Sequence, residues 1–284
     1  MRYLVFTFCL LFCTFFSSQN QSLQAREVAS LFEHQVQTQL LMDIEAAMAR
    51  AQAQHGIIPD WAAEEILAKS DADLVNEKAL RDEYKVVRHR MVAFLNVWGR
   101  KMANGAEQYI HFGATTVDIY DTLLVLQLLR AIDLFIIDQQ AIEDTLISLA
   151  EKYKTTPMVG RTLGQHALPI TFGKKVSGWL GENRRHIERL KMVRTKLRKS
   201  AILKGAVGSY LGLGEKAIVV EQDFAKFLGL DMPYTDDWHG SRDTLAEYAM
   251  TIALISKSYG RWGQEVFLMQ STDLAELLET RPST

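Results

Sequence analysis

The chain has 284 residues, of which 48% are hydrophobic and 23% are charged. A chain of this length and apolar content can bury a sizeable core in one or a few domains, which excludes intrinsic disorder as its class. Its formal net charge is only -2, with basic and acidic residues interspersed. The sequence therefore lacks the basic excess that a nucleic-acid-binding surface requires, and we expect no nucleic-acid partner.

Residues 1–24 form an apolar leader that we set apart from the fold. The hydrophobic run from Tyr3 to Phe16 is too short to span a bilayer, so we expect no stable membrane span. The run is typical of a secretory signal peptide, although no A-x-A cleavage pattern follows it. A misassigned start codon or a buried terminal helix is the alternative. Both cysteines, Cys9 and Cys13, lie here, so the rest of the chain offers neither a disulfide nor a cysteine-based metal site.

Residues 25–114 are predicted to form a small helical N-terminal domain. Apolar residues recur at helical spacing over Val28–Gln54, Asp60–Lys69 and Asp82–Met102. The pair His55-Gly56 is typical of a helix end, and Asp60 after Pro59 is typical of a helix cap.

The segment from Thr116 to about Lys154 is predicted to be one unbroken helix. It contains neither glycine nor proline up to Thr156, and its leucine and isoleucine residues recur at helical spacing. At 1.5 Å per residue this helix would extend roughly 60 Å. Thr115 or Thr116 can cap its start, and Asp118 is placed to interact favourably with the positive end of the helix dipole.

Two further long helices are predicted over Ile170–Ser200 and Ser241–Leu278. The basic residues between Arg184 and Lys199 recur at helical spacing, which predicts a solvated helix face. No segment shows a convincing strand alternation. The fold class is therefore all-α: an elongated bundle of long central helices, covering residues 115–284, preceded by the small N-terminal domain. Helices of this length leave apolar surface that favours association between subunits.

The glycine-rich segment KGAVGSYLGLGEKA, residues 204–217, does not fit a phosphate-binding loop. Gly212-Leu213-Gly214 followed by Ala217 is similar to part of a dinucleotide fingerprint, but no strand precedes it and no βαβ unit surrounds it. We interpret the segment as a loop whose backbone approaches something closely, either a ligand or another helix.

Polar residues concentrate at three junctions between a loop and a long helix. In the first, HFGATTVDIYDT at 111–122, the N–H groups of a helix start and the hydroxyls of Thr115 and Thr116 can bind a carboxylate; simple capping is the alternative. The second, MVGRTLGQHALPITFGKK at 158–175, carries Arg161, Thr162, Gln165 and His166. The third, DDWHGSRDTLAE at 236–247, carries His239 and Arg242.

These stretches resemble the signatures of the aspartase/fumarase superfamily. HFGATTVDIYDT is similar to the first signature, H-x-G-x-T-S-x-D-x-x-D-T, and GRTLGQHALPITFG is similar to the second, G-R-T-H-x-x-x-A-x-P-x-T-x-G. The resemblance continues through MDIEAAMARAQAQHGIIP, RHRMVAF, GAVGS and WHGSRDTLAE, from about Val28 to the end. It is closest to the adenylosuccinate lyase and 3-carboxy-cis,cis-muconate cycloisomerase branches.

The resemblance implies a homotetramer whose active sites combine signature loops from three subunits. Most members remove a proton next to a carboxylate and expel an amine or alkoxide to leave fumarate. Charge that develops on the carboxylate needs donors that are already oriented. By this resemblance Thr115 and Thr116 hold a carboxylate of a small-molecule substrate, and His89 and Thr162 line the same site. The other residues that the resemblance assigns to substrate binding are Gln165, Ser241 and Arg242.

Several positions depart from the family pattern. Leu163 stands where many lyases of the family carry a histidine that protonates the leaving group, and leucine cannot transfer a proton. The leaving group would then be protonated by another acid, His89 or His166, or would leave without protonation. The cycloisomerase branch commonly lacks the histidine that Leu163 replaces. Arg90 stands where adenylosuccinate lyases carry an acid, which argues against a nucleotide substrate. Ser241 stands where members often carry a glutamine.

The third signature of the family, around S-S-x-M-P-x-K-x-N-P, supplies the catalytic base serine and should follow LMQSTDLAELLE, but the sequence ends at Thr284. We therefore expect an N-terminal fragment, either an incomplete gene model or a truncated paralogue, that is inactive by itself. The leading hypothesis is a lyase or cycloisomerase of the superfamily, and the alternative is a helical assembly protein that lost the chemistry. Metal-dependent hydrolysis is disfavoured, because none of the seven histidines has metal-ligand spacing, and we expect no cofactor. The resemblance implies a cytoplasmic location, while the leader leaves secretion open.

Overall fold

The computed structural model of the protein describes residues 27–235 and 240–278. The predicted leader and His239 lie outside the described residues. The described chain divides into two compact units, which we call unit 1 and unit 2. Unit 1 comprises Glu27, Ile132–Val193 and residues 246–278, and unit 2 comprises Val28–Ala131 and Arg194–Leu245. The domain boundary proposed at residue 115 stays a prediction.

The first half of unit 2 is built from short helices. In chain order they are α3 (His34–Gln54), α4 (Asp60–Ala68), the 3-10 helix η1 (Ala72–Leu74), α5 (Glu77–Val87), α6 (Arg90–Gly99) and the 3-10 helix η2 (Ala106–Tyr109). Helix α3 ends at Gln54, with His55 as its cap as predicted, and Gly56 follows with a left-handed φ of 67°. The predicted start at Val28 is wrong, because a turn at residues 31–33 precedes α3, which begins at His34. Pro59, not Asp60, occupies the cap position of α4. Asp60 lies in the first turn, where its negative charge interacts favourably with the positive end of the helix dipole.

The single helix predicted from Asp82 to Met102 is wrong, because the chain breaks between α5 and α6. Arg88 adopts a left-handed backbone with φ 55°, and His89 is extended. The Nδ1 atom of His89 accepts a hydrogen bond from the backbone N–H of Val92, which is the contact of a helix cap. Apolar periodicity alone does not report such a break, since both helices keep the same spacing of apolar residues.

Helix α3 forms the centre of unit 2, where it contacts α4, η1 and α9 (Ala217–Phe227). Its residues Met42, Ile44 and Met48 have no exposed surface. Because neighbours cover α3 on several sides, its apolar residues lie on more than one face of the helix.

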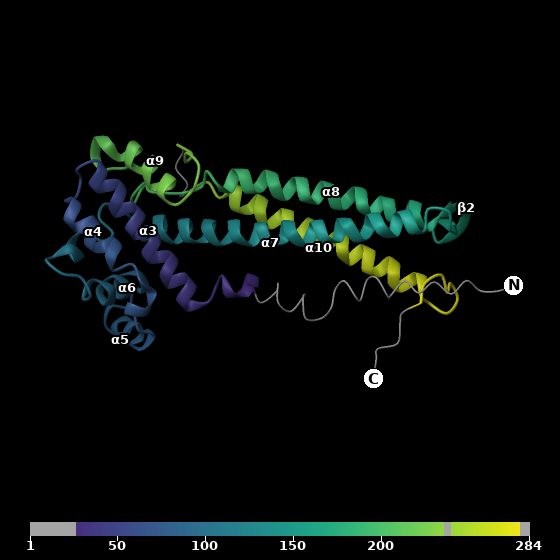
Figure 1. The fold of residues 1–284 in the computed structure, drawn as a ribbon, viewed down its shortest axis with the longest axis horizontal. Coiled ribbons are helices and arrows are strands. Elements are labelled where there is room, and N and C mark those ends of the chain that lie inside the picture. Colours follow the sequence, from purple (N-terminus) through teal and green to yellow (C-terminus); the bar gives the residue numbers. More distant parts are fainter. Residues whose placement is uncertain (1–26, 236–239, 279–284) are drawn as a thin grey trace. The chain divides into compact units, whose positions relative to one another are not determined.

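The three long helices are confirmed, each with shorter bounds than predicted. Helix α7 (Thr116–Lys152) is one unbroken helix, and α8 (Phe172–Leu197) and α10 (Asp243–Met269) follow it in the chain (Figure 1). Between α8 and α10 lie the 3-10 helix η3 (Gly214–Lys216) and α9. Each long helix contributes residues to both units. No helix in the described part of the chain is long and apolar enough to cross a membrane.

The loop expected before α8 is instead an antiparallel hairpin of two short strands, β1 (Pro157–Thr162) and β2 (Gln165–Thr171). Its two-residue tip, Leu163-Gly164, has φ values of 53° and 74°. Positive φ at both positions is the geometry of a tight hairpin turn, for which asparagine and glycine are usual. Leucine carries no such signal, and most of the hairpin is exposed, so neither turn chemistry nor alternation revealed the strands.

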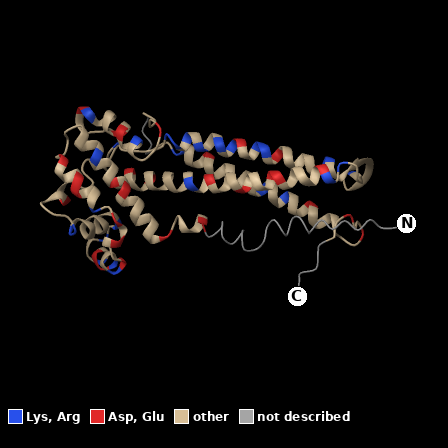
Figure 2. Cartoon of the chain, viewed as in Figure 1, with Lys and Arg blue, Asp and Glu red and all other residues tan. Residues whose placement is uncertain are grey.

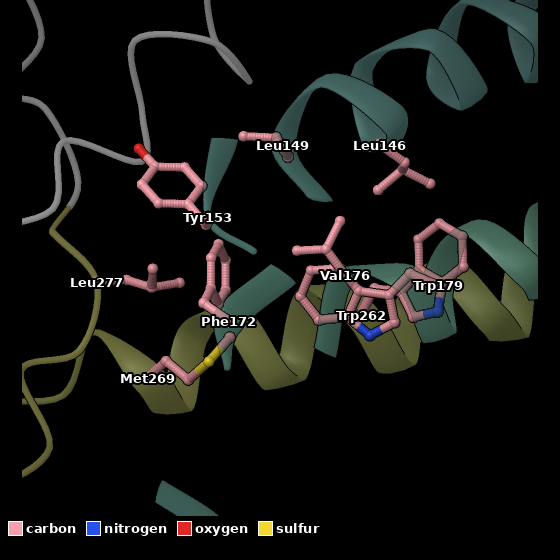
Figure 3. Close-up of a cluster of buried hydrophobic side chains, with 9 residues drawn as sticks. All are labelled: Leu146, Leu149, Tyr153, Phe172, Val176, Trp179, Trp262, Met269 and Leu277. Atoms are coloured by element: carbon pink, nitrogen blue, oxygen red, sulfur yellow. The ribbon is translucent and has the colours of Figure 1, made fainter. Parts of the chain in front are cut away.

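Unit 1 is held together by a hydrophobic cluster that joins α7, α8 and α10. The cluster consists of Leu146, Leu149, Tyr153, Phe172, Val176, Trp179, Trp262, Met269 and Leu277 (Figure 3). The indole rings of Trp179 and Trp262 stack with centroids 6.0 Å apart, and the ring of Tyr259 meets Trp262 edge-on. Aromatic rings contribute much of the buried area in such a core, so this cluster fixes the packing of the helices in unit 1.

A polar layer crosses the same helices. The buried Asn183 donates to the main-chain carbonyl of Gln139 at 2.8 Å, and the hydroxyl of Tyr259 donates to the Gln139 side chain at 2.6 Å. Burial raises the pKa of the Tyr259 phenol, which therefore stays protonated as a donor. Because buried polar groups need partners, this layer favours one register of the three helices.

Basic residues recur along α8, as Figure 2 shows. Arg184, Arg185, Lys191 and Lys196 are exposed, which confirms the solvated helix face predicted for this segment. Apart from the hairpin, the regular structure of the described residues is helical, so the all-α fold class is confirmed.

Candidate functional site

The start of α7 carries the threonines of the first signature. Thr115 precedes the helix, Thr116 is its first residue, and both are partly exposed. The buried Asp118 accepts hydrogen bonds from the N–H of Thr115 at 3.0 Å and of Gly205 at 2.9 Å. The acidic side chain in the first turn therefore accepts from the N–H of the residue before the helix, as in a capping box, and the cap predicted at Thr115 or Thr116 stays a prediction. This contact fixes the backbone at the point where the two hydroxyls project.

The glycine-rich segment packs its backbone directly against the first signature. A Cβ atom on Gly113 would lie 2.7 Å from Leu213 and 3.0 Å from the carbonyl oxygen of Gly212. A Cβ atom on Gly212 would lie 2.8 Å from the Cα of Gly113. The close neighbour that the glycines predicted is therefore another loop of unit 2, the one that leads into α7.

His111, the first residue of the signature, forms a buried pair with Glu45 of α3. The His111 backbone N–H donates to Glu45 at 2.9 Å, and its Nδ1 lies 2.7 Å from the other carboxylate oxygen. Burial lowers the pKa of His111, but the hydrogen bond and charge of Glu45, with the charge of Asp118, outweigh it and raise the pKa above its ordinary value. We did not predict this pair. The signal was a glutamate within the apolar run MDIEAAMA, where a buried carboxylate needs a partner.

His89 lies at the start of α6 and is exposed. Its Nδ1 accepts from the Val92 N–H, which leaves Nε2 as the outward ring atom. The neighbouring Arg90 acts electrostatically on Tyr120, one turn beyond the start of α7: burial raises the pKa of the Tyr120 phenol and the Arg90 charge opposes that shift.

The third junction also meets the start of α7. Ser241 and Arg242 are exposed and directly precede α10. The Arg242 guanidinium forms an ion pair with Asp121, whose side chain is only 12% exposed. Within unit 2 the structure thus brings Arg242 to the helix end that carries Thr115 and Thr116.

The second signature lies on the hairpin of unit 1. Thr162, Gln165 and His166 are exposed, and Leu163 at the tip is 100% exposed. Arg161 instead makes a bidentate pair with Glu276, both contacts being 2.8 Å, and this hydrogen bonding raises the pKa of Arg161. A guanidinium held in this way anchors the hairpin and is not offered to a ligand.

The predicted site residues therefore fall into two groups. His89, Thr115, Thr116, Ser241 and Arg242 belong to unit 2, while Thr162, Gln165 and His166 belong to unit 1. Within the described ranges, no group of three or more histidine, cysteine, aspartate or glutamate side chains is arranged to hold a metal ion.

A half-open cavity of about 600 Å³ lies elsewhere in unit 2, beside α6 and η2. Its lining includes Asn96, Arg100 and Glu107, and both Asn96 and Arg100 already contact Glu83. None of the predicted site residues lines it. The cavity is therefore separate from the signature loops.

Comparison with known proteins connects these loops to a family. The profile of the lyase family matches residues 16–283. 3-Carboxy-cis,cis-muconate cycloisomerase of Pseudomonas aeruginosa is 37% identical over 90% of this chain and 56% of its own length. Adenylosuccinate lyase of Methanocaldococcus jannaschii is 36% identical over 89% of this chain and 54% of its own length. The crystal structure of fumarate lyase from Mesorhizobium sp. BNC1 matches 88% of this chain and 58% of that chain with a TM-score of 0.82 and 35% identity. The chain thus spans about half the length of these relatives.

Proposed function

Because the chain belongs to the lyase family within the aspartase/fumarase superfamily, we propose that it forms the carboxylate-binding part of a lyase or cycloisomerase. The proposed substrate is a small di- or tricarboxylate. The proposed reaction removes a proton next to a carboxylate and eliminates the group on the neighbouring carbon to leave fumarate, or closes a muconate to its lactone.

The start of α7 is the observation that carries this proposal. Thr115 and Thr116 place two hydroxyls beside the first amides of a long helix, where an anion is stabilised. Asp118 is buried and holds the backbone from inside, so the hydroxyls keep their place without a ligand. Donors that are already oriented are what a carboxylate needs when negative charge develops on it during proton removal.

The remaining roles follow from charge and exposure. We assign Arg242, with Ser241, to a second carboxylate of the substrate, because the side chain of Arg242 is 47% exposed beside the start of α7. Thr162 and Gln165 are assigned to the substrate from the hairpin, as hydrogen-bonding side chains that no core contact requires.

The proton chemistry favours a leaving group that departs as an anion. Leu163 at the hairpin tip cannot donate a proton. We assign any acid role to Nε2 of His89 or to His166, both of which are exposed. In lactonisation a carboxylate oxygen adds to the double bond and a proton is added to the carbon next to another carboxylate. In the reverse direction the carboxylate leaves without protonation, whereas an amine requires a proton to leave, so muconate lactonisation suits these residues better than the release of an amine.

We further propose a homotetramer in which signature loops of different subunits combine. Exposed apolar side chains in unit 1 support this assembly: Ile137, Met192, Met250, Leu254 and Phe267 are each at least 45% exposed. Apolar residues of this kind along long helices are normally covered by a partner.

Binding of a dicarboxylate tests the proposal. We expect the chain to bind fumarate or 3-carboxy-cis,cis-muconate in calorimetric titration, and the double variant Thr115→Val/Thr116→Val to bind about tenfold more weakly or worse, because valine keeps the shape and removes both donors. Thr145→Val, on the same helix in unit 1, is the matched control and should bind normally. Unchanged affinity in the double variant would remove the basis of the proposal.

A further inference from the structure

Lys204 is a buried cation to which neither the family signatures nor the proposed function assigns a role. It is only 2% exposed. Its Nζ donates to the hydroxyl of Tyr210 at 2.5 Å and to the main-chain carbonyl of Tyr234 at 2.8 Å, and lies 3.2 Å from the Glu221 carboxylate. An ammonium has three hydrogens, and these three acceptors match them, which is the condition for burying a charge.

Glu221 completes a closed network around this cation. It is 3% exposed and accepts hydrogen bonds from the Tyr210 hydroxyl at 2.7 Å and from the Leu203 N–H at 3.1 Å. Burial raises the pKa of Glu221, and the Tyr210 hydrogen bond and the charge of Lys204 oppose that shift. Charge balance would be met by Lys204 and Glu221 alone. The hydrogen bond from Lys204 to the Tyr234 carbonyl is therefore not needed to neutralise the charge of Glu221.

The main chain of Lys204 reaches the start of α7. Its N–H donates to Asp118 at 3.2 Å, and Asp118 also holds the N–H of Thr115. Its carbonyl accepts from the N–H of Tyr210 at 2.9 Å. One residue therefore contacts the start of α7, the glycine-rich segment, α9 and the segment around Tyr234, which precedes Ser241 in the chain.

We propose that Lys204 is a positioning residue of the candidate site, which holds the main chain at Tyr234 against the start of α7. Its side chain holds Tyr234 while its main chain holds Asp118, so Tyr234 and the start of α7 share one anchor. The consequence for a substrate rests on the proposed function, but the anchoring itself does not.

Two variants separate positioning from charge balance. Lys204→Met removes the ammonium and leaves a buried carboxylate without its partner, so it is expected to destabilise the whole chain. The double variant Lys204→Met/Glu221→Gln is neutral: the new amide oxygen can still accept from the Leu203 N–H, and the amide NH2 can donate to the hydroxyl oxygen of Tyr210, so its melting temperature should return towards that of the wild type. Only the donor to the Tyr234 carbonyl is then missing. Lys216→Met is the control, because Lys216 is an exposed lysine of the same segment that donates to the carbonyl of His55.

Hydrogen exchange followed by mass spectrometry is the first measurement. In the double variant we expect the amide of Tyr234, which bonds the Lys199 carbonyl at 3.0 Å, to exchange about tenfold faster, the factor for one lost hydrogen bond. In the double variant the amides of α3 should exchange at the wild-type rate. In Lys216→Met both the Tyr234 amide and the α3 amides should exchange at the wild-type rate. Wild-type exchange at Tyr234 in the double variant would reduce Lys204 to a counter-ion of Glu221 and overturn the proposal.

Fumarate affinity is the second measurement, and it distinguishes the two proposals. If the wild type binds fumarate, the double variant should bind it about tenfold more weakly, since one positioning hydrogen bond is lost. Unchanged affinity together with faster exchange would show that the anchor does not serve the site, and would overturn the positioning role. If the wild type binds no dicarboxylate, the proposed function fails, and exchange at Tyr234 alone decides whether Lys204 anchors the segment.

Discussion

His111 and Glu45 show how a single buried pair sets a loop. The imidazole and the carboxylate meet at 2.7 Å, and Glu45 is 1% exposed. His111 also has a left-handed backbone with φ 60°, a conformation that costs free energy for a residue with a side chain. The two contacts to Glu45 offset that cost, so the loop before α7 depends on the protonation state of one histidine.

The pH dependence of stability follows from this pair. Because the pKa of His111 in the folded chain is raised above its ordinary value of 6.5, the pair stabilises the fold fully below that value. The contribution is lost as the pH rises through the folded pKa. We therefore expect the difference in unfolding free energy between the wild type and Glu45→Gln to be largest near pH 5.5 and to shrink by about 1 kcal/mol or more towards pH 8.5.

Urea unfolding at several pH values measures this difference, and NMR titration of His111 measures its pKa directly. In Glu45→Gln the NMR midpoint should move down, since burial lowers the pKa of His111 and the hydrogen bond and charge of Glu45 no longer oppose that shift. Glu64→Gln, an exposed carboxylate of α4, should leave both unchanged. A difference that grows with pH would contradict the assigned ion pair.

At the scale of elements, the ends of helices are decided by contacts that apolar spacing does not report. Asn76 accepts from the N–H groups of Lys78 and Ala79 and so begins α5 before Asp82, where we had expected the helix to start. His89 begins α6 in the same way, whereas Asp118 in the first turn of α7 accepts from the N–H of Thr115, the residue before the helix. Each cap is a polar side chain whose role depends on the local backbone, so several starts were equally compatible with the spacing.

The hairpin tip offers a test of backbone strain in an element. Leu163 is fully exposed and has a left-handed backbone, so its side chain gains nothing from burial within the chain. Replacement with asparagine, which tolerates this conformation and forms the favoured Asn-Gly turn, should stabilise the chain by about 1 kcal/mol. Thermal unfolding should shift upwards by about 2–4 °C.

Leu168→Asn is the control for this variant. Leu168 is 77% exposed on the same hairpin, but φ at this position is not positive, so asparagine brings no relief there. A fall in melting temperature for Leu163→Asn would mean that the leucine is buried by another molecule in the assembled protein.

At the scale of the whole molecule, exposed apolar residues on the long helices bear on assembly. Phe267 on α10 is 64% exposed, and the adjacent Leu268 is 49% exposed. Side chains of this size are normally inside a protein or inside an interface. In the proposed homotetramer a neighbouring subunit covers these side chains, which are exposed in the single chain.

Sedimentation velocity tests this assembly. We expect the wild-type chain to associate, and Phe267→Glu to weaken association about tenfold or more, because it places a charge in an apolar interface. Gln264→Glu adds the same charge at an exposed position of the same helix and should associate as the wild type does. A wild type that remains monomeric at all accessible concentrations would rule out the assembly.

The sequence by itself determined the family and the long helices. Repeated apolar spacing without glycine or proline is a local property, so α7 was predicted within two residues of its observed end at Lys152. The signature motifs were also readable directly, since each is a short run of adjacent residues.

Only the tertiary structure decided which distant groups meet. The partner of Glu45 is His111, the partner of Arg161 is Glu276, and the close neighbour of Gly212 is Gly113. It also replaced the predicted loop at 158–169 with a hairpin whose tip residue gives no turn signal. The physical reason is that a buried charge and a close backbone contact depend on residues far apart in the chain, about which local periodicity carries no information. The tight turn is local, but it forms at Leu163, a residue type that is not typical of such turns.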